Sequence, residues 1–248
     1  MKILIGIIVF LLYSPLGFGQ KSKLPMQKKH QIAFSEDRTK AIIKKNSKIV
    51  YDLSEVETNR LTYMLEAVNM KIYPNQEKML VDYFSFLISL RKNESYINYR
   101  GVLLSDRLID KPTLKLLQVI AVVEINRLRQ EQKLPNLLFS EKLLQVAQDY
   151  ADYCTKSNQE QSHFDKQGNG PAERVEKVMP GWGRRISENI FSGHTNSKQS
   201  IIAFSKSPGH LANMVDVEAQ FVAIGISRHS DGRLFYVQNF IKKLKVFD

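Results

Sequence analysis

The chain has 248 residues, a formal net charge of +11 and a 43% apolar composition, which is enough for one sizeable hydrophobic core plus an appended region. Its single cysteine, Cys154, permits no intramolecular disulfide, so the small disulfide-stapled secreted folds are excluded. The positive charge comes without zinc-finger spacing or a glycine-aromatic RNA signature, so we expect no nucleic-acid partner.

The first 19 residues have the order of a secretory signal peptide. Lys2 precedes an unbroken apolar run over residues 3–13, and small residues follow as far as Gly19. The run is too short for a comfortable transmembrane helix, which needs about 20 apolar residues. We therefore expect cleavage before Gln20 and a bacterial protein that is secreted or periplasmic, without a transmembrane span in the mature chain. An uncleaved membrane anchor is the alternative.

Residues 20–112 are predicted to form a basic lead followed by a mainly helical region. The lead, residues 20–50, is rich in lysine and contains one strand-like piece at residues 41–50. Apolar residues at three- and four-residue steps predict helices over residues 54–70 and 74–90. The lysines suit attraction to anionic envelope polymers or lipid head groups, and a merely solubilising surface is the alternative.

From residue 113 onward, predicted helices are joined by predicted strands. Helices are expected over residues 113–133, 140–154, 172–178 and 197–205, and strands over residues 186–192, 222–227 and 234–241. Asp231-Gly232 supplies the turn between the last two strands. This order predicts an α/β sandwich with an antiparallel sheet in a domain spanning residues 113–248.

Five short motifs follow one another in this domain. They are Glu-Ile-Asn-Arg-Leu-Arg at 124–129, Ser-His at 162–163, Ser-Glu-Asn-Ile at 187–190, Ser-Pro-Gly-His-Leu-Ala-Asn-Met at 207–214, and Tyr-Val-Gln-Asn-Phe at 236–240. In this order and spacing they resemble the CAP superfamily (cysteine-rich secretory proteins, antigen 5, pathogenesis-related proteins), also called the SCP domain, in its disulfide-free bacterial form. The resemblance implies a three-layer α-β-α sandwich with a mainly antiparallel sheet and a cleft on one face.

The family's cleft is lined by two histidines and two glutamates. Three of them carry over by resemblance, namely His163, Glu188 and His210. Ser207 stands where the second glutamate usually lies, and Phe204 stands at the place of a family tryptophan. No catalytic residue is assigned. The predicted cleft residues are His163, Glu188, His210, Ser207 and Asn213.

Two interpretations of the cleft stay open. Two imidazoles and one carboxylate, His163, His210 and Glu188, could bind a divalent metal such as Zn²⁺ with water as the fourth ligand, and the metal would activate that water for hydrolysis. Alternatively, both histidines hydrogen-bond to Glu188 or to the backbone as a structural polar network. Cys154 falls on an apolar helix face and is expected to be a buried, inert thiol. No cofactor other than this candidate metal is implied.

The sequence favours a secreted binding or interaction module whose cleft engages an envelope polymer, a lipid or a protein. The family includes members that bind sterols and other lipids, so the resemblance makes a lipid ligand conceivable. The alternative is a metal-assisted hydrolase of peptide or ester bonds that uses His163, Glu188 and His210. A third hypothesis places the interaction in the helical N-terminal region, with the CAP domain as its carrier. The sequence does not decide between binding and catalysis.

Overall fold

The computed structural model describes residues 30–35, 40–45, 48–53, 55–72, 111–157, 162–182, 185–193 and 195–242. The chain divides into two compact units, Met1–Thr62 and Tyr63–Asp248. The predicted signal peptide and the predicted helix at 74–90 lie outside the described residues. In the described part of the chain, no helix combines the length and the apolar content that a membrane crossing requires.

The first unit contains a small antiparallel sheet. Its strands are β1 (His30–Phe34), β2 (Ala41–Lys45) and β3 (Lys48–Leu53), which lie in the order β1-β2-β3. The sequence predicted a single strand-like piece at 41–50, and the structure has two strands there and adds β1. Helix α1 (Glu55–Asn69) follows and confirms the first predicted helix.

The second unit is built on a four-stranded sheet. Its strands are β4 (Leu138–Phe139), β5 (Ile186–Gly193), β6 (Phe221–Arg228) and β7 (Leu234–Ile241), in the order β4-β6-β7-β5. Only the short β4 runs parallel to its neighbour β6, and the other pairs are antiparallel. The prediction of a mainly antiparallel sheet is therefore confirmed.

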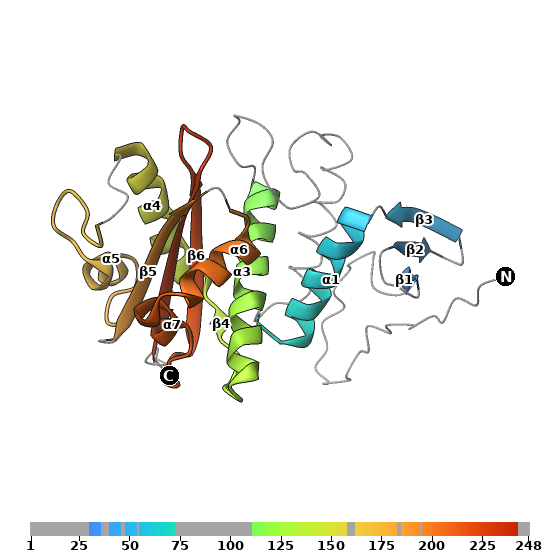
Figure 1. Ribbon diagram of the computed structural model, residues 1–248, viewed down its shortest axis with the longest axis horizontal. Coiled ribbons are helices and arrows are strands. Elements are labelled where there is room, and N and C mark those ends of the chain that lie inside the picture. Colours follow the sequence, from blue (N-terminus) through green and yellow to red (C-terminus); the bar gives the residue numbers. More distant parts are fainter. Residues whose placement is uncertain are drawn as a thin grey trace, which may run out of the picture. The chain divides into compact units, whose positions relative to one another are not determined.

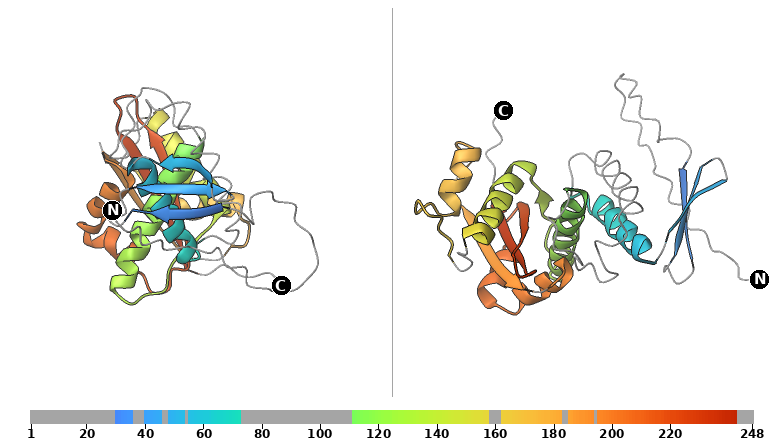
Figure 2. Two further views of the ribbon diagram at one scale, coloured as in Figure 1. Left: turned by 90° about the vertical axis from the view of Figure 1, so that its right-hand side faces the viewer. Right: turned by 90° about the horizontal axis from the view of Figure 1, so that it is seen from above.

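Helices cover both faces of this sheet. They are α3 (Lys111–Glu131), α4 (Glu141–Ser157), α5 (Pro171–Val178), α6 (Ser197–Ser205) and α7 (Pro208–Met214). Figures 1 and 2 show α4 and α5 on one face and α3, α6 and α7 on the other. All eight residues of β7 are buried, as expected for a central strand covered on both sides. The three-layer α-β-α sandwich is confirmed.

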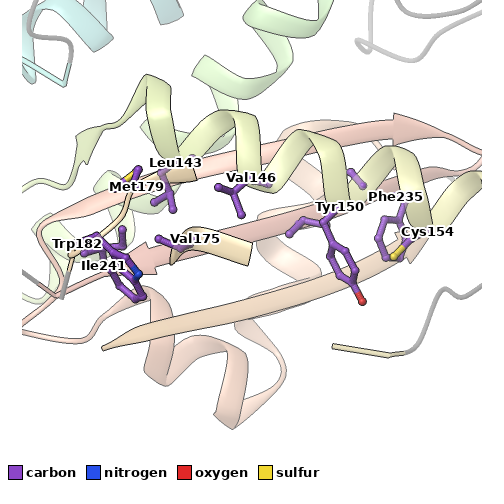
Figure 3. Close-up of a cluster of buried hydrophobic side chains, with 13 residues drawn as sticks. Leu143, Val146, Tyr150, Cys154, Val175, Met179, Trp182, Phe235 and Ile241 are labelled. Carbon is purple, nitrogen blue, oxygen red and sulfur yellow. The ribbon is translucent and has the colours of Figure 1, made fainter. Parts of the chain in front are cut away.

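The core between α4 and the sheet forms because α4 carries an apolar stripe at helical spacing. The stripe consists of Leu143, Val146, Ala147, Tyr150, Ala151 and Cys154. It packs against Phe235, Val237 and Ile241 of β7, and Figure 3 shows Trp182 and Cys154 at opposite ends of this cluster. Cys154 is buried, as predicted, and Trp182 covers the core.

A fully buried arginine ties α3 to the segment that follows α7. Arg129 donates to the carbonyl oxygens of Pro135 (2.8 Å), Met214 (2.9 Å), Asp216 (2.8 Å) and Ala219 (3.4 Å). A guanidinium can be buried only if its donors are satisfied, and here backbone oxygens do this. The final arginine of the 124–129 motif therefore has a structural role.

A side chain completes the edge of β6 where β4 ends. Strand β4 pairs only with Phe221 and Val222, so among the described residues no strand lies beside the rest of β6 on that side. There the Gln148 amide of α4 donates to the Ile226 carbonyl oxygen (2.8 Å) and accepts from the Ile226 amide (3.0 Å). Gln118 of α3 donates to the same Gln148 oxygen (3.2 Å), so the two helix layers meet over this edge. These hydrogen bonds satisfy backbone groups of β6 that could otherwise pair with a strand of another molecule.

The last part of α1 belongs to the second unit. The Tyr63 hydroxyl donates to Glu124 of α3 (2.5 Å), and Arg127 donates to both Glu124 (2.6 Å) and Glu66. The Phe139 amide of β4 donates to the Ile72 carbonyl oxygen (2.8 Å). Residues 63–72 thus share hydrogen bonds with the sandwich, while the domain boundary at 112/113 stays a prediction.

We predict that Gly225→Ala destabilises the fold strongly. A Cβ atom at Gly225 would lie 2.0 Å from the Ala147 carbonyl oxygen, because α4 crosses β6 at this point. Backbone would have to move, so the free energy of unfolding should fall by more than about 3 kcal/mol, beyond ordinary overpacking. Urea unfolding measures this.

Gly209→Ala is the matched control for that substitution. A Cβ at Gly209 meets nothing within 4 Å, and the residue lies in helix α7. Alanine is a better helix former, so this change should be neutral or stabilise by up to about 1 kcal/mol. Equal effects of the two substitutions would contradict the close approach of α4 to β6.

Candidate functional site

Four polar residues stand opposite one another in the middle of β5 and β7. Glu188 pairs in register with Asn239, and Asn189 pairs with Gln238. All four are buried. Each pair is also joined by its side chains, since Asn239 Nδ2 donates to Glu188 Oε2 (2.9 Å) and Asn189 Nδ2 donates to Gln238 Oε1 (2.9 Å). Because successive strand residues point to opposite faces, the two pairs serve different helix layers.

Glu188 faces the layer formed by α4 and α5, and both of its carboxylate oxygens have hydrogen-bond partners. Its side chain is 1% exposed. Oε2 accepts from Arg174 Nη2 (2.6 Å) as well as from Asn239, and Oε1 lies 3.0 Å from His163 Nδ1. A buried carboxylate needs a cation and hydrogen-bond donors to remain ionised, and Arg174 supplies the balancing charge.

Arg174 is the site residue that the sequence did not reveal. Its guanidinium lies over the Tyr150 ring, with Cζ 3.5 Å from the ring centroid, a cation–π contact that helps to bury the charge. Nη1 donates to the carbonyl oxygens of His163 and Asn169 (both 2.9 Å). The only sequence signal is that Arg174 lies beside Val175 and four residues before Val178 on the inward side of a charged helix.

The loop over residues 162–170 holds His163 at the surface. The Tyr150 hydroxyl donates to the Ser162 carbonyl oxygen (2.5 Å), and Ser162 Oγ accepts from the Phe164 amide (3.0 Å). Asp165 accepts from the backbone amides of two later loop residues, which fixes the turn. The His163 side chain is 45% exposed and Phe164 is 58% exposed. Since a carboxylate only accepts, Nδ1 of His163 carries the hydrogen and Nε2 stays available to a ligand.

His210 lies on α7, next to α6. Pro208 opens helix α7, where its fixed φ suits the first helical position. Ser207 is the N-cap residue of α7. The His210 ring packs edge-on against Phe204, with ring centroids 5.2 Å apart. Burial lowers the pKa of His210 below its usual value, and electrostatic repulsion from His163 lowers it further.

Asn189 reaches the α7 layer on the other face of β5. Its Nδ2 donates to the His210 carbonyl oxygen (3.0 Å), and its Oδ1 accepts from Asn213 Nδ2 (2.8 Å). Asn213 therefore braces the segment that carries His210.

The structure brings most of the predicted site residues together. His163 and Glu188 are hydrogen-bonded, and His210 lies near enough to His163 for their charges to interact. Asn213 contacts Asn189, while Ser207 occupies the N-cap position of α7, where its carbonyl oxygen accepts from the Leu211 amide. The cleft itself stays a prediction.

The described residues do not fit a metal ion as they stand. In this part of the chain, no group of three or more His, Cys, Asp or Glu side chains could hold one. Both oxygens of Glu188 are already engaged, and His163 uses Nδ1 to reach it. The metal site expected from His163, Glu188 and His210 gains no support from this geometry.

Comparison with known proteins gives one family match. Residues 122–240 match the family described as CAP, cysteine-rich secretory protein family. No curated protein matches the chain.

Three solved bacterial structures are similar. An extracellular protein containing an SCP domain from Bacillus anthracis is 22% identical with a TM-score of 0.47, and the match covers 54% of this chain and 44% of that one. An outer surface protein from Borrelia burgdorferi is 24% identical with a TM-score of 0.48, covering 55% and 98% of the two chains. A cysteine-rich secretory protein from Staphylococcus aureus is 15% identical with a TM-score of 0.41, covering 51% and 38%. The chain thus spans less than half the length of the first relative.

We predict that Arg174→Met destabilises the fold by about 3–5 kcal/mol, because it leaves the Glu188 carboxylate buried without its cation. Urea unfolding measures the loss. Arg185→Met is the control, since Arg185 and Glu218 form an exposed ion pair whose removal should cost about 0–1 kcal/mol.

A second substitution tests the cause of that loss. Adding Glu188→Gln to Arg174→Met removes the uncompensated charge and should recover part of the lost stability. If the single substitution costs no more than Arg185→Met, Arg174 does not carry the proposed charge balance.

We predict that His210 makes the fold less stable in mild acid. Its folded pKa lies below the usual 6.5, so the unfolded chain binds the proton more readily. The contribution to stability is complete above pH 6.5 and is lost as pH falls toward the folded pKa. Urea midpoints between pH 7.5 and 5 should fall more for the wild type than for His210→Gln, and identical pH profiles would contradict this.

Proposed function

Because residues 122–240 form a domain of the cysteine-rich secretory protein (CAP) family, we propose that this chain is an exported binding module whose ligand site is formed by His163, Glu188 and His210. The ligand is an envelope polymer, a lipid or a protein surface. The exposed half of His163 and the neighbouring ring of Phe164 would make the first contacts.

The observation that carries the proposal is the hydrogen bonding of Glu188. Its two oxygens accept from Arg174, Asn239 and His163, and the carboxylate is almost fully enclosed. A general base needs a free oxygen within reach of a substrate proton, and an open catalytic metal site needs ligands without competing partners. Such a carboxylate orients His163 and is itself unsuited to act as the base or as an open metal ligand, which supports the binding proposal over the metal-assisted hydrolase.

Export is proposed from the predicted signal peptide at residues 1–19. The lysine-rich lead that follows it would attract anionic polymers or lipid head groups, and the site would then select among them. In this proposal the lead supplies long-range attraction and the domain supplies specificity. The predicted interactive role of the N-terminal region becomes an auxiliary one.

We predict that His163→Ala weakens binding of the mature chain to purified peptidoglycan or to vesicles containing phosphatidylglycerol by roughly tenfold, equivalent to about 1.4 kcal/mol. The physical reason is the loss of the imidazole that Glu188 orients. Co-sedimentation at fixed salt measures the affinity, and Lys166→Ala, an exposed charge in the same loop, is the matched control.

Three results would count against the proposal. Equal binding by the wild type and His163→Ala would show that His163 is not part of the ligand site. Equal losses in His163→Ala and Lys166→Ala would assign binding to surface charge. Release of soluble products from either probe, together with stoichiometric metal by elemental analysis and loss of that release on chelation, would favour the metal-assisted hydrolase instead.

A further inference from the structure

We propose that Asn189 is a positioning residue that fixes His210 relative to His163, so that one strand sets the spacing of the two imidazoles. This rests on the proposed function only in taking the two histidines as ligand-binding groups. Asn189 was part of a sequence motif but was given no role of its own.

The proposal begins with two neighbouring residues of β5. Glu188 holds the His163 ring through Oε1 (3.0 Å), and Asn189 holds the His210 carbonyl oxygen through Nδ2 (3.0 Å). The two side chains leave the strand on opposite faces. Glu188 and Asn189 are joined by one peptide bond, and each holds one of two histidines that are 47 positions apart in the sequence.

The strand is a firm base for both supports. Residues 186–193 of β5 all pair with β7, and Asn189 is itself locked to Gln238 Oε1 (2.9 Å). A paired strand with buried polar cross-strand partners resists sliding, because a slip by one residue would move Glu188 and Asn189 to the wrong faces. Because β5 is held rigidly, the distance between the two histidines that it supports is fixed as well.

The Asn189 amide is almost fully used. Its two N–H groups go to His210 and Gln238, and its oxygen accepts from Asn213 Nδ2 (2.8 Å). Only an amide offers two donors and an acceptor at this reach. Asn213 lies one helical turn beyond His210 on α7, so this helix is held at two points of one face.

The support of His210 acts on its backbone and leaves the ring free. The ring packs against Phe204 on α6 in a T-shaped arrangement, and the hydrogen bond from Asn189 goes to the His210 carbonyl oxygen. Asn189 therefore influences the imidazole only through the placement of α7, which defines positioning as its role.

The test is NMR of the ligand-free, full mature chain at one pH. Asn189→Ala should shift the imidazole Cε1–H resonance of His210 and accelerate amide exchange in α7 by at least tenfold, while the His163 resonance moves much less. Asn213→Ala should move His210 in the same direction by a smaller amount. Ser187→Ala is the matched control, since its buried hydroxyl on the same face of β5 has no hydrogen-bond partner among the described residues.

An unchanged His210 resonance in Asn189→Ala, or equal shifts of both histidines, would overturn the proposal. If Asn189→Ala does not fold, Asn213→Ala decides, and an unchanged His210 resonance there overturns it as well. The two proposals fail separately, because this spectrum needs no ligand, whereas the binding proposal fails when His163→Ala binds its probe as the wild type does.

Discussion

A carboxylate buried in the middle of a sheet is the constraint on which this domain depends. Burial of Glu188 there is balanced by Arg174, which approaches from α5, and by Asn239, which donates from the next strand. The same guanidinium holds the carbonyl oxygens at both ends of the His163 loop. The ion pair therefore fixes three features together, namely the register of β5 on β7, the placement of α5, and the presentation of His163.

This arrangement limits the chemistry that the site can support. Both oxygens of Glu188 already accept hydrogen bonds and the side chain is almost fully enclosed, so a substrate cannot reach it directly. His163 in turn uses Nδ1 on Glu188, so only Nε2 remains to meet a ligand. The proposed recognition by hydrogen bonding and apolar contact would use the oriented imidazole of His163, the half-buried imidazole of His210 and the exposed ring of Phe164.

The sequence predicted the features that depend on periodicity and failed where a residue's partner lies far along the chain. The α4 stripe and the buried Cys154 follow from apolar residues at helical spacing, and β6 and β7 follow from apolar runs on either side of the Asp231-Gly232 turn. The resemblance supplied His163, Glu188 and His210. Arg174 could not be inferred, because its burial depends on Tyr150 and Glu188, and nothing local separates it from the other charged residues of α5.

The same distinction explains why residues 208–214 form helix α7. Pro208 and Gly209 are common in turns, and local propensity alone favours one there. Helix α7 forms because Asn189 and Phe204 hold its residues against β5 and α6, and these contacts come from distant parts of the chain. Tertiary contacts override weak local preference, as they do for short helices in general.

The site residues carry little net charge, so long-range attraction of an anionic ligand and its recognition at the site depend on different parts of the chain. The Glu188–Arg174 pair contributes no net charge, and the lowered pKa of His210 keeps that imidazole neutral at pH 7. Neither group can draw an anionic polymer from a distance. The excess of lysine and arginine in the chain is concentrated outside these residues, above all in the lead sequence. Any long-range attraction should therefore weaken with added salt, while the contacts at His163, which act over hydrogen-bond distance, should be much less sensitive to it.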